Sequence, residues 1–374
     1  MPTATDGLHL ICNRPALVEA LAMASAVVPS RSPVPVHMCV KLEAVDGTLT
    51  LKATDAEIGL DLHLPSVEIS SEGEALLPAE KFSQIARAMD DATVKVSLDR
   101  HAATIQGAHS TFKIYGHDPA EFPGTADTTQ AAPDFQVPAG QLRRMIARTV
   151  FSVATDNSRY AISGVLIERK ARRLRMVGTD GRRMALVKGD CAAPAEGDSA
   201  FIVPAKAMNV LNRLLDDPEA AVRVSRDRNR VVFEIGDSAT LVTSLVEGTF
   251  PPFEDVIPKE HDREATFDSA ELAAAIKRAA LLTSEESRAI KFSFDGTTLT
   301  LKSHATDMGE AEIVVQATAY KGDKIEIGFM PAFLTDVLRI VESPEVTLEM
   351  KASSKPCVLR VGADFLYVVM PVNA

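Results

Sequence analysis

The chain has 374 residues, of which 46% are hydrophobic and 24% charged, and its formal net charge at pH 7 is −11. This length suits two or three domains with sizeable cores. No apolar run of about 18 residues is present that would span a membrane, and the acidic balance argues against indiscriminate nucleic-acid binding.

The first residues and the cysteines predict a cytoplasmic protein. Residues 1–15 lack a basic start followed by a long apolar stretch, so we expect no secretory signal. The four cysteines are scattered without a CxxC pair, which is typical of free thiols in a reducing compartment. Neither they nor the eight histidines have the spacing of metal ligands. We therefore expect no metal and no cofactor.

Helical patterns recur along the chain. Apolar residues three and four apart predict a first set of helices over 14–28, 139–153 and 269–282. A second helix follows each of three prolines, which are separated by 126 and 127 residues: Pro78, Pro204 and Pro331. Each proline ends an apolar strand and opens a helix, where its fixed φ and missing N–H cost little. Alternating strands are predicted after these helices, over 92–98, 220–225 and 345–350.

A strand that stops at Thr-Asp occurs three times. The stretches are TLTLKATD (48–55), RLRMVGTD (173–180) and TLTLKSHATD (298–307). Their last residues, separated by 125 and 127 positions, are Asp55, Asp180 and Asp307. A third marker, an aromatic residue or Met before Pro, recurs at Phe122-Pro123, Phe250-Pro251 and Met370-Pro371.

Three landmarks with one period indicate three tandem copies of one module. A module of this length can bury its own core, so each is a domain and not a solenoid unit. The predicted bounds are 1–131, 132–260 and 261–374. Strands dominate, and two helices accompany them in each copy. The predicted class is α+β, an antiparallel sheet with two helices packed on one face.

Basic residues gather in one segment and on the predicted helices. Residues 141–186 contain eleven basic and three acidic side chains, a net charge of +8. The helices carry Arg87, Arg143, Arg144, Arg148, Lys206, Arg213, Lys277 and Arg278. Ordinary solvated helix faces would explain any one of them. Because equivalent helices repeatedly carry the charge, a shared surface that faces a polyanion is the better interpretation.

Several stretches together resemble the β sliding clamp family of bacterial replicative DNA polymerase. They are GTDGRRMALVKGD (178–190), VPAKAMNVLNRLL (203–215), SLVEGTFPPFEDVIP (244–258) and YVVMPVNA (367–374). The resemblance implies a DNA-clamp fold in which two chains join head to tail into a closed ring. It implies a homodimer that encircles duplex DNA and tethers the replicative polymerase for processivity. It also implies no catalysis, and an ATP-driven clamp loader that opens the ring.

Sliding requires contacts that do not read bases. Phosphate contacts are independent of sequence and position the duplex. Aromatic residues make up 5% of the chain and tryptophan is absent, which argues against base stacking.

The resemblance implies a cleft that binds short linear peptides of the polymerase, the loader and repair proteins. The matching residues are Ile162, Thr179, Gly181, Arg182, Arg183, Met184, Pro251, Val256, Val368, Met370 and Pro371. Methionine and valine supply an adaptable wall. The alternative is that these residues form a turn, core strands and a last strand. The chain departs from the family in its ending, Val372-Asn373-Ala374, and at Asp255, where a basic residue is common.

The resemblance also implies DNA contacts and a ring seam. The matching DNA-contact residues are Arg31, Arg87, Arg148, Tyr160, Lys206, Arg213 and Arg278; Ala161 stands where the family often has a second tyrosine. At the seam, an edge strand near 110–116 would pair with one near 309–315. Lys113 facing Glu310 or Glu312 would help to select the partner and register. Leu281 and Leu282 would be the apolar part of the seam, or alternatively core.

Two other functions compete with the sliding clamp. An enzyme is disfavoured because the chain has no GxxxxGK[ST], no GxGxxG after a strand and no GxSxG. The alternative function is a clamp-shaped scaffold that binds partners without being loaded onto DNA. It is retained because the chain ending departs from that of the family.

Overall fold

The structure is a computed structural model that describes residues 7–65, 67–124, 133–155, 160–193, 197–284, 288–306 and 308–373. The chain divides into two compact units. Unit 1 contains Met1–Leu142, Ala192–Glu196 and Asn209–Leu245, and unit 2 contains Arg143–Cys191, Gly197–Met208 and Val246–Ala374. The middle third of the chain thus contributes to both. Each unit is described by itself.

Unit 1 contains two antiparallel sheets. The five-stranded sheet has the order β5 (Val67–Ser71), β1 (His9–Asn13), β7 (Thr93–Asp99), β8 (Ala102–Gln106), β9 (Thr111–Tyr115). The eight-stranded sheet has the order β10 (Phe135–Pro138), β15 (Ala221–Asp227), β16 (Arg230–Ile235), β17 (Ala239–Ser244), β4 (Ile58–Leu64), β3 (Thr48–Thr54), β2 (Cys39–Val45), β6 (Gly73–Pro78). Short 3-10 turns are η1 (Pro35–Met38) and η2 (Pro119–Glu121).

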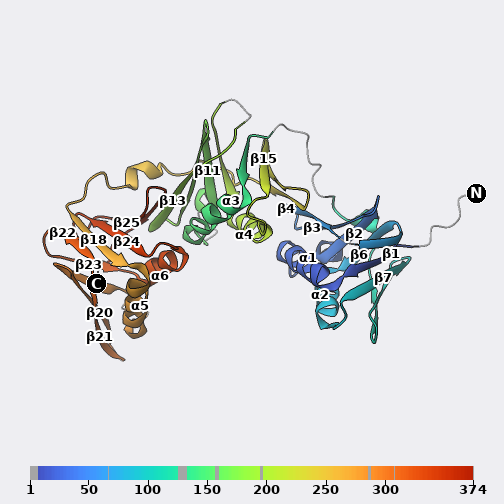
Figure 1. Cartoon of the computed structure of the whole chain (residues 1–374), viewed down its shortest axis with the longest axis horizontal. Helices are drawn as coiled ribbons and strands as arrows, with labels where there is room; N and C mark the ends of the chain where they lie inside the picture. Colours follow the sequence, from blue (N-terminus) through green and yellow to red (C-terminus); the bar gives the residue numbers. More distant parts are fainter. Residues whose placement is uncertain are drawn as a thin grey trace, which may run out of the picture. The chain divides into compact units, whose positions relative to one another are not determined.

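Two helices of unit 1 pack against each other, α1 (Arg14–Val27) and α2 (Ala79–Ala88), and α1 also lies on β3 and β4 (Figure 1). Asn13 caps α1 by accepting a hydrogen bond from the Ala16 N–H at 3.1 Å. The predicted apolar stripe is the buried one, since Leu17 and Leu21 are fully covered. Burying each such leucine contributes roughly 1.5–3 kcal/mol.

Unit 2 contains a nine-stranded and a four-stranded antiparallel sheet. The larger has the order β14 (Ser199–Pro204), β11 (Gly164–Lys170), β12 (Arg173–Thr179), β13 (Arg183–Asp190), β26 (Phe365–Val369), β25 (Cys357–Val361), β24 (Glu345–Met350), β18 (Arg263–Asp268), β22 (Ala319–Lys321). The smaller has the order β21 (Gly309–Gln316), β20 (Thr298–Ala305), β19 (Ile290–Asp295), β23 (Ile325–Phe329). Its 3-10 turns are η3 (Val150–Ser152), η4 (Tyr160–Ile162), η5 (Phe253–Val256) and η6 (Ala280–Leu282).

The helices α5 (Ser269–Ala279) and α6 (Pro331–Ile340) pack together in unit 2 (Figure 1). An aromatic core lies beneath them, in which Phe292 meets Phe329 edge-on with 5.2 Å between ring centroids. Two further helices, α3 (Ala139–Ala147) and α4 (Ala205–Leu214), begin in one unit and end in the other. The six helices have the predicted starts, and the antiparallel α+β class is confirmed.

The Thr-Asp stop forms the same turn in both described copies. Asp55 accepts the N–H groups of Glu57 and Ile58 at 3.0 and 2.7 Å. Asp180 accepts those of Arg182 and Arg183 at 2.9 and 3.0 Å. In each copy the preceding threonine hydroxyl donates to the carbonyl four residues on. The repeat is therefore a side-chain-capped turn between two strands, while Asp307 lies outside the described residues.

Strands from different modules join by one recurring pairing. The strand after the first Thr-Asp turn, β4, pairs with β17, the last strand of the second module. The strand after the second turn, β13, pairs with β26, the last strand of the third module. The corresponding remaining strands, β21 and β9, each lie at the edge of their sheet. One edge of each type is thus left unpaired within the described chain.

Three helices end at other residues than predicted. The long first helices end earlier, at Val27, Ala147 and Ala279. After Ala147 the Thr149 hydroxyl bonds back to the Met145 carbonyl at 2.9 Å, and a 3-10 turn follows. Asp268 caps α5 by accepting the Glu271 N–H at 2.8 Å.

Candidate partner-binding groove

An apolar groove of about 400 Å³ opens on unit 2. Ten of the eleven residues predicted for the peptide cleft line it, and Pro371, which follows Met370, does not. Ala161, Pro252 and Phe253 complete the lining and were missed in the sequence. For Pro252 and Phe253 the sequence signal is the run FPPF (250–253). In the structure Phe253 belongs to the buried cluster beneath the groove.

The groove has a buried floor and an exposed apolar rim. Met184 and Val368 are each 2% exposed and belong to one core cluster with Phe253 and Leu366. Val256 is 49% exposed and Met370 39% exposed. Core and groove are therefore not alternatives here, since the core strands β13 and β26 form the floor. Exposed apolar side chains beside a hollow are typical of an interaction site.

The capped turn at Asp180 shapes one end of the groove. Gly181 has φ +85°, a conformation that favours glycine. The Met370 N–H donates to the Arg182 carbonyl at 2.9 Å, which carries the strand pairing of β13 and β26 beyond the last ladder residues. The Val372 N–H donates to the Gly328 carbonyl at 2.9 Å, so the chain ending is held beside β23.

Arg183 is anchored inside the protein. Its Nη2 donates to the Phe151 carbonyl at 3.0 Å, and its guanidinium lies 4.7 Å from the centroid of Phe333. Burial alone would lower the pKa of Arg183, but the hydrogen bond that Arg183 donates to Asp336 and the charge of Asp180 outweigh it and raise the pKa. Arg183 thus stays charged, and its donors face protein acceptors.

No group of three or more His, Cys, Asp and Glu side chains that could hold a metal occurs among the described residues. The four cysteines are buried thiols, and burial raises the pKa of Cys39 to about 11. Within the described part of the chain, no helix combines the length and apolarity that a bilayer crossing needs.

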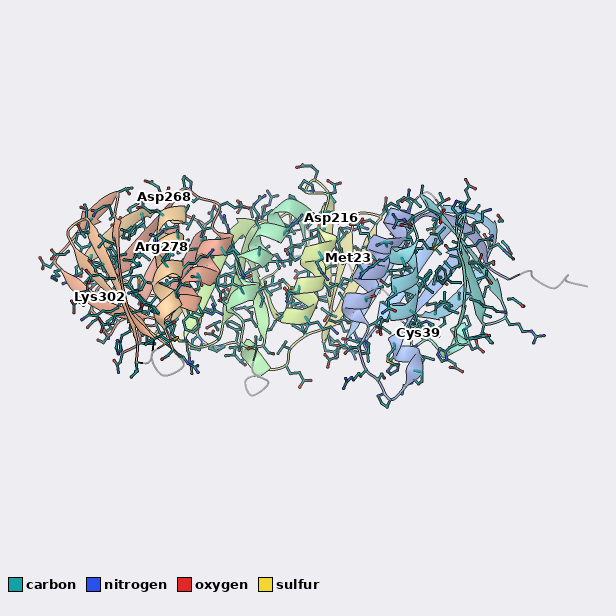
Figure 2. The ribbon with its side chains drawn as sticks, turned by 90° about the horizontal axis from the view of Figure 1, so that it is seen from below. Met23, Cys39, Asp216, Asp268, Arg278 and Lys302 are labelled. Carbon is teal, nitrogen blue, oxygen red and sulfur yellow. The ribbon has the colours of Figure 1, made fainter. Side chains whose placement is uncertain are left out.

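The predicted DNA-contact residues lie in both units. Arg31, Arg87, Lys206, Arg213 and Arg278 are exposed. Arg87, Arg213 and Arg278 stand in the last turns of α2, α4 and α5, where a cation also complements the helix dipole. Figure 2 shows Arg278 on its helix and Lys302 on the neighbouring sheet. Arg148 is half-buried beside Phe365, and the Tyr160 side chain lies outside the described residues.

Much of the basic segment 141–186 is neutralised within the fold. Arg173 pairs with Asp190 at 2.9 Å, Arg175 with Glu168 at 2.6 Å, and Arg183 with Asp336 at 2.7 Å. Arg169 is 2% exposed. The exposed charges on α3, Arg143 and Arg144, belong to the helix set that the sequence singled out.

Three of the five predicted seam residues lie on sheet edges, and the other two lie in η6. Lys113 is exposed on β9, and Glu310 and Glu312 are exposed on β21. Both glutamates already have cross-strand partners, His304 at 3.3 Å and Lys302 at 2.8 Å. Leu281 is 76% exposed and is not a core residue, whereas Leu282 is half-buried.

Tandem α+β modules, joined strand to strand and carrying an apolar groove, define the class of DNA clamps. Three family models match in chain order. The DNA polymerase III beta subunit N-terminal domain matches residues 8–126, the central domain 136–252 and the C-terminal domain 254–373. The chain belongs to the DNA polymerase III beta subunit family, the beta sliding clamps. Members of this family are non-catalytic processivity factors in DNA replication.

Curated relatives and solved structures agree. The beta sliding clamp of Chlamydia pneumoniae is 30% identical over 367 residues, covering 98% of this chain and 99% of that protein. That of Escherichia coli (strain K12) is 30% identical over 368 residues, with 96% and 98% covered. A Pseudomonas aeruginosa sliding clamp, crystallised bound to griselimycin, has a TM-score of 0.90 at 29% identity, with 98% and 100% covered. The sliding clamp of Bacillus subtilis, at 24% identity and TM-score 0.90, shows the fold alone.

Proposed function

We propose that two copies of this chain close head to tail into a ring around duplex DNA in the cytoplasm. The ring tethers the replicative polymerase, and an ATP-driven loader places it on DNA. The module bounds 1–131, 132–260 and 261–374 belong to this proposal. The residues matched by the three family models, 8–126, 136–252 and 254–373, support these bounds.

One observation carries the ring. Two junctions between modules use the strand after the Thr-Asp turn and the last strand of the following module. The chain has one further strand of each kind, β21 and β9, and both lie at sheet edges. Edge strands with free N–H and C=O groups are templates for pairing. Pairing β21 of one copy with β9 of the next repeats the junction and forms a nine-stranded sheet, like the one in unit 2.

The seam has side chains suited to association. Leu281, Val314 and Tyr115 are 76%, 54% and 77% exposed. Val314 and Tyr115 lie on the two edge strands, and Leu281 lies in η6, which contacts β21. Lys113 offers a cation to the acidic strand β21, and the Glu312 pair with Lys302 would become a shared network. Such charges set register and partner choice more than affinity.

The groove of unit 2 takes short linear peptides from the polymerase, the loader and repair proteins. Its floor of Met184 and Val368 and its rim of Val256 and Met370 accept large apolar side chains. The sequence-independent hold on DNA comes from the lysine and arginine residues of the helices and from Arg31. Those contacts are electrostatic and weaken with salt.

Removing residues 370–374 tests the groove separately from the ring. The truncated protein loses binding to overlapping fluorescent peptides that cover the host polymerase, while sedimentation still reports a dimer. Unchanged peptide affinity after the truncation contradicts the proposed site. Loss of the dimer contradicts the separation of groove and seam. A clamp-shaped scaffold that is never loaded would bind peptide yet fail to be retained on DNA.

A further inference from the structure

One wall of the groove stands on a short turn. The turn η5 (Phe253–Val256) supplies Phe253 and Val256 to the lining. It lies in the long connection between β17 and β18. Its own backbone bonds are long: Asp255 N to Pro252 O and Ile257 N to Glu254 O both measure 3.4 Å. Four residues and two weak bonds do not fix a turn, so its position depends on side-chain contacts.

Besides the packing of Phe253 in the core cluster, Arg175 supplies polar and cation–π contacts from the sheet. Its Nη1 donates to the Glu254 carboxylate at 2.7 Å, and its guanidinium carbon lies 5.3 Å from the centroid of the Phe253 ring. It therefore holds η5 at two adjacent residues, by an ion pair and by a cation–π contact. The hydrogen bond from Arg175 lowers the pKa of Glu254, so the pair is charged at neutral pH.

Arg175 is itself fixed before it reaches the turn. It stands opposite Glu168 in the pairing of β11 and β12, and Glu168 Oε2 accepts from Arg175 Nε at 2.9 Å. The side chains of Arg175 and Glu168 are only 22% and 17% exposed. A neighbouring cross-strand pair, Arg173 on β12 with Asp190 on β13, is 79% and 71% exposed and does not line the groove. Solvated pairs of that kind contribute little.

We propose that Arg175 is a positioning residue of the peptide groove, which holds the η5 wall in place through Glu254 and Phe253. This inference rests on the proposed peptide-binding function of that groove. A wall already in its bound position spares the peptide the entropy of ordering it. The link therefore raises affinity without touching the peptide.

The experiment compares matched variants of the full-length protein. Glu254→Ala removes the link and leaves the Arg175–Glu168 pair intact. Asp255→Ala removes the same charge from the next residue, and Asp190→Ala breaks the solvated pair with Arg173. Glu254→Gln keeps an oxygen acceptor for Arg175. Arg175→Met, alone and combined with Glu254→Ala, completes a double-mutant cycle. The probe is the fluorescent host-polymerase peptide that binds wild type best.

The readouts are peptide Kd and the methyl NMR signals of Val256 in the free protein. We expect Glu254→Ala to raise Kd about two- to fivefold, and to shift and broaden the Val256 signals. The Kd of Glu254→Gln should lie between those of wild type and Glu254→Ala. Asp255→Ala and Asp190→Ala should resemble wild type in both readouts. In the Arg175→Met background Glu254→Ala should add no further loss.

Two results would overturn the inference. One is an equal Kd for Glu254→Ala and Asp255→Ala, with unchanged Val256 signals. The other is a double-mutant cycle in which the effects of Arg175→Met and Glu254→Ala on the free energy of peptide binding add in full. A wild type that binds no polymerase peptide would instead defeat the proposed function, and the Val256 signals of the peptide-free variants would still decide whether Arg175 positions η5.

Discussion

Arg183 on β13 donates a hydrogen bond to Asp336 on α6, with 2.7 Å between Nη1 and Oδ2. The two residues are 153 positions apart in sequence and belong to different modules. The same guanidinium bonds Asp180 at 3.0 Å, so one side chain links the Thr-Asp turn, the sheet and a helix. Arg183 therefore stabilises the turn and the strand that line the groove.

Asp336→Ala should destabilise unit 2. The change leaves a mostly buried cation, 12% exposed, without one of its two carboxylates. We expect a loss of about 1–3 kcal/mol in the free energy of unfolding, measured by urea denaturation. Arg339→Ala is the matched control, because Arg339 reaches Asp336 only at 3.9 Å and is 70% exposed. Equal effects of the two changes would contradict the anchoring role of Arg183.

Met370→Ala should weaken peptide binding and spare the fold. Met370 is 39% exposed at the groove rim, and only its side chain is removed, since its backbone bond to Arg182 is kept. We expect Kd to rise about tenfold, the scale of one apolar anchor lost from an interface, measured by fluorescence anisotropy. Met308→Ala, on an exposed methionine outside the groove lining, should leave Kd unchanged. A wild-type Kd for Met370→Ala would place the peptide elsewhere.

Stability should fall in acid through Glu349. Arg360 donates to both of its oxygens at 2.8 and 2.9 Å, and these hydrogen bonds lower the pKa of Glu349 from its ordinary 4.5. Because the folded pKa is the lower one, the stabilisation is complete above pH 4.5 and is lost as pH falls through the folded value.

Urea unfolding of wild type and Glu349→Gln at neutral pH and at about pH 3 checks this. The difference in free energy of unfolding between wild type and Glu349→Gln should be smaller at the acidic pH. Glu260→Gln removes the charge of a 78% exposed partner of Lys351. Its free energy of unfolding should differ less from that of wild type at both pH values. A gap for Glu349→Gln that is independent of pH would argue against the linkage.

The sequence periods predicted the modules because each landmark is local. The Thr-Asp stop repeats because Asp55 and Asp180 cap their own turns within three residues. Helix starts followed from apolar periodicity and from proline. Helix ends did not, because Thr149 and the 3-10 turn after α3 depend on how the chain packs afterwards.

The groove was predicted through family resemblance and not through pattern. Phe253 was not predicted as a groove residue because its burial depends on the pairing of β13 with β26, two strands that are distant in sequence. Arg175 was counted with the basic segment, but Glu168 and Glu254 neutralise it from a neighbouring strand and from a distant turn. Formal charge in a sequence does not reveal which cations have partners in the fold.

Leu281→Asp should weaken the dimer while each chain stays folded. The side chain is 76% exposed, so the change opens no cavity within the chain. In the ring it would bury a carboxylate at the seam, where Leu281 otherwise offers an apolar side chain, and burying a charge is costly. Sedimentation equilibrium should report more monomer at a given concentration, with unchanged circular dichroism. Val45→Asp, on an exposed apolar residue of β2 in the eight-stranded sheet, is the control and should stay dimeric.

Retention on DNA tests the central claim most directly. The protein is loaded onto nicked circular duplex DNA with the host loader and ATP, and the DNA is then cut once. A closed ring should stay on the circle and run off the linear form. Equal retention on both forms would mean ordinary DNA binding and would contradict topological encirclement.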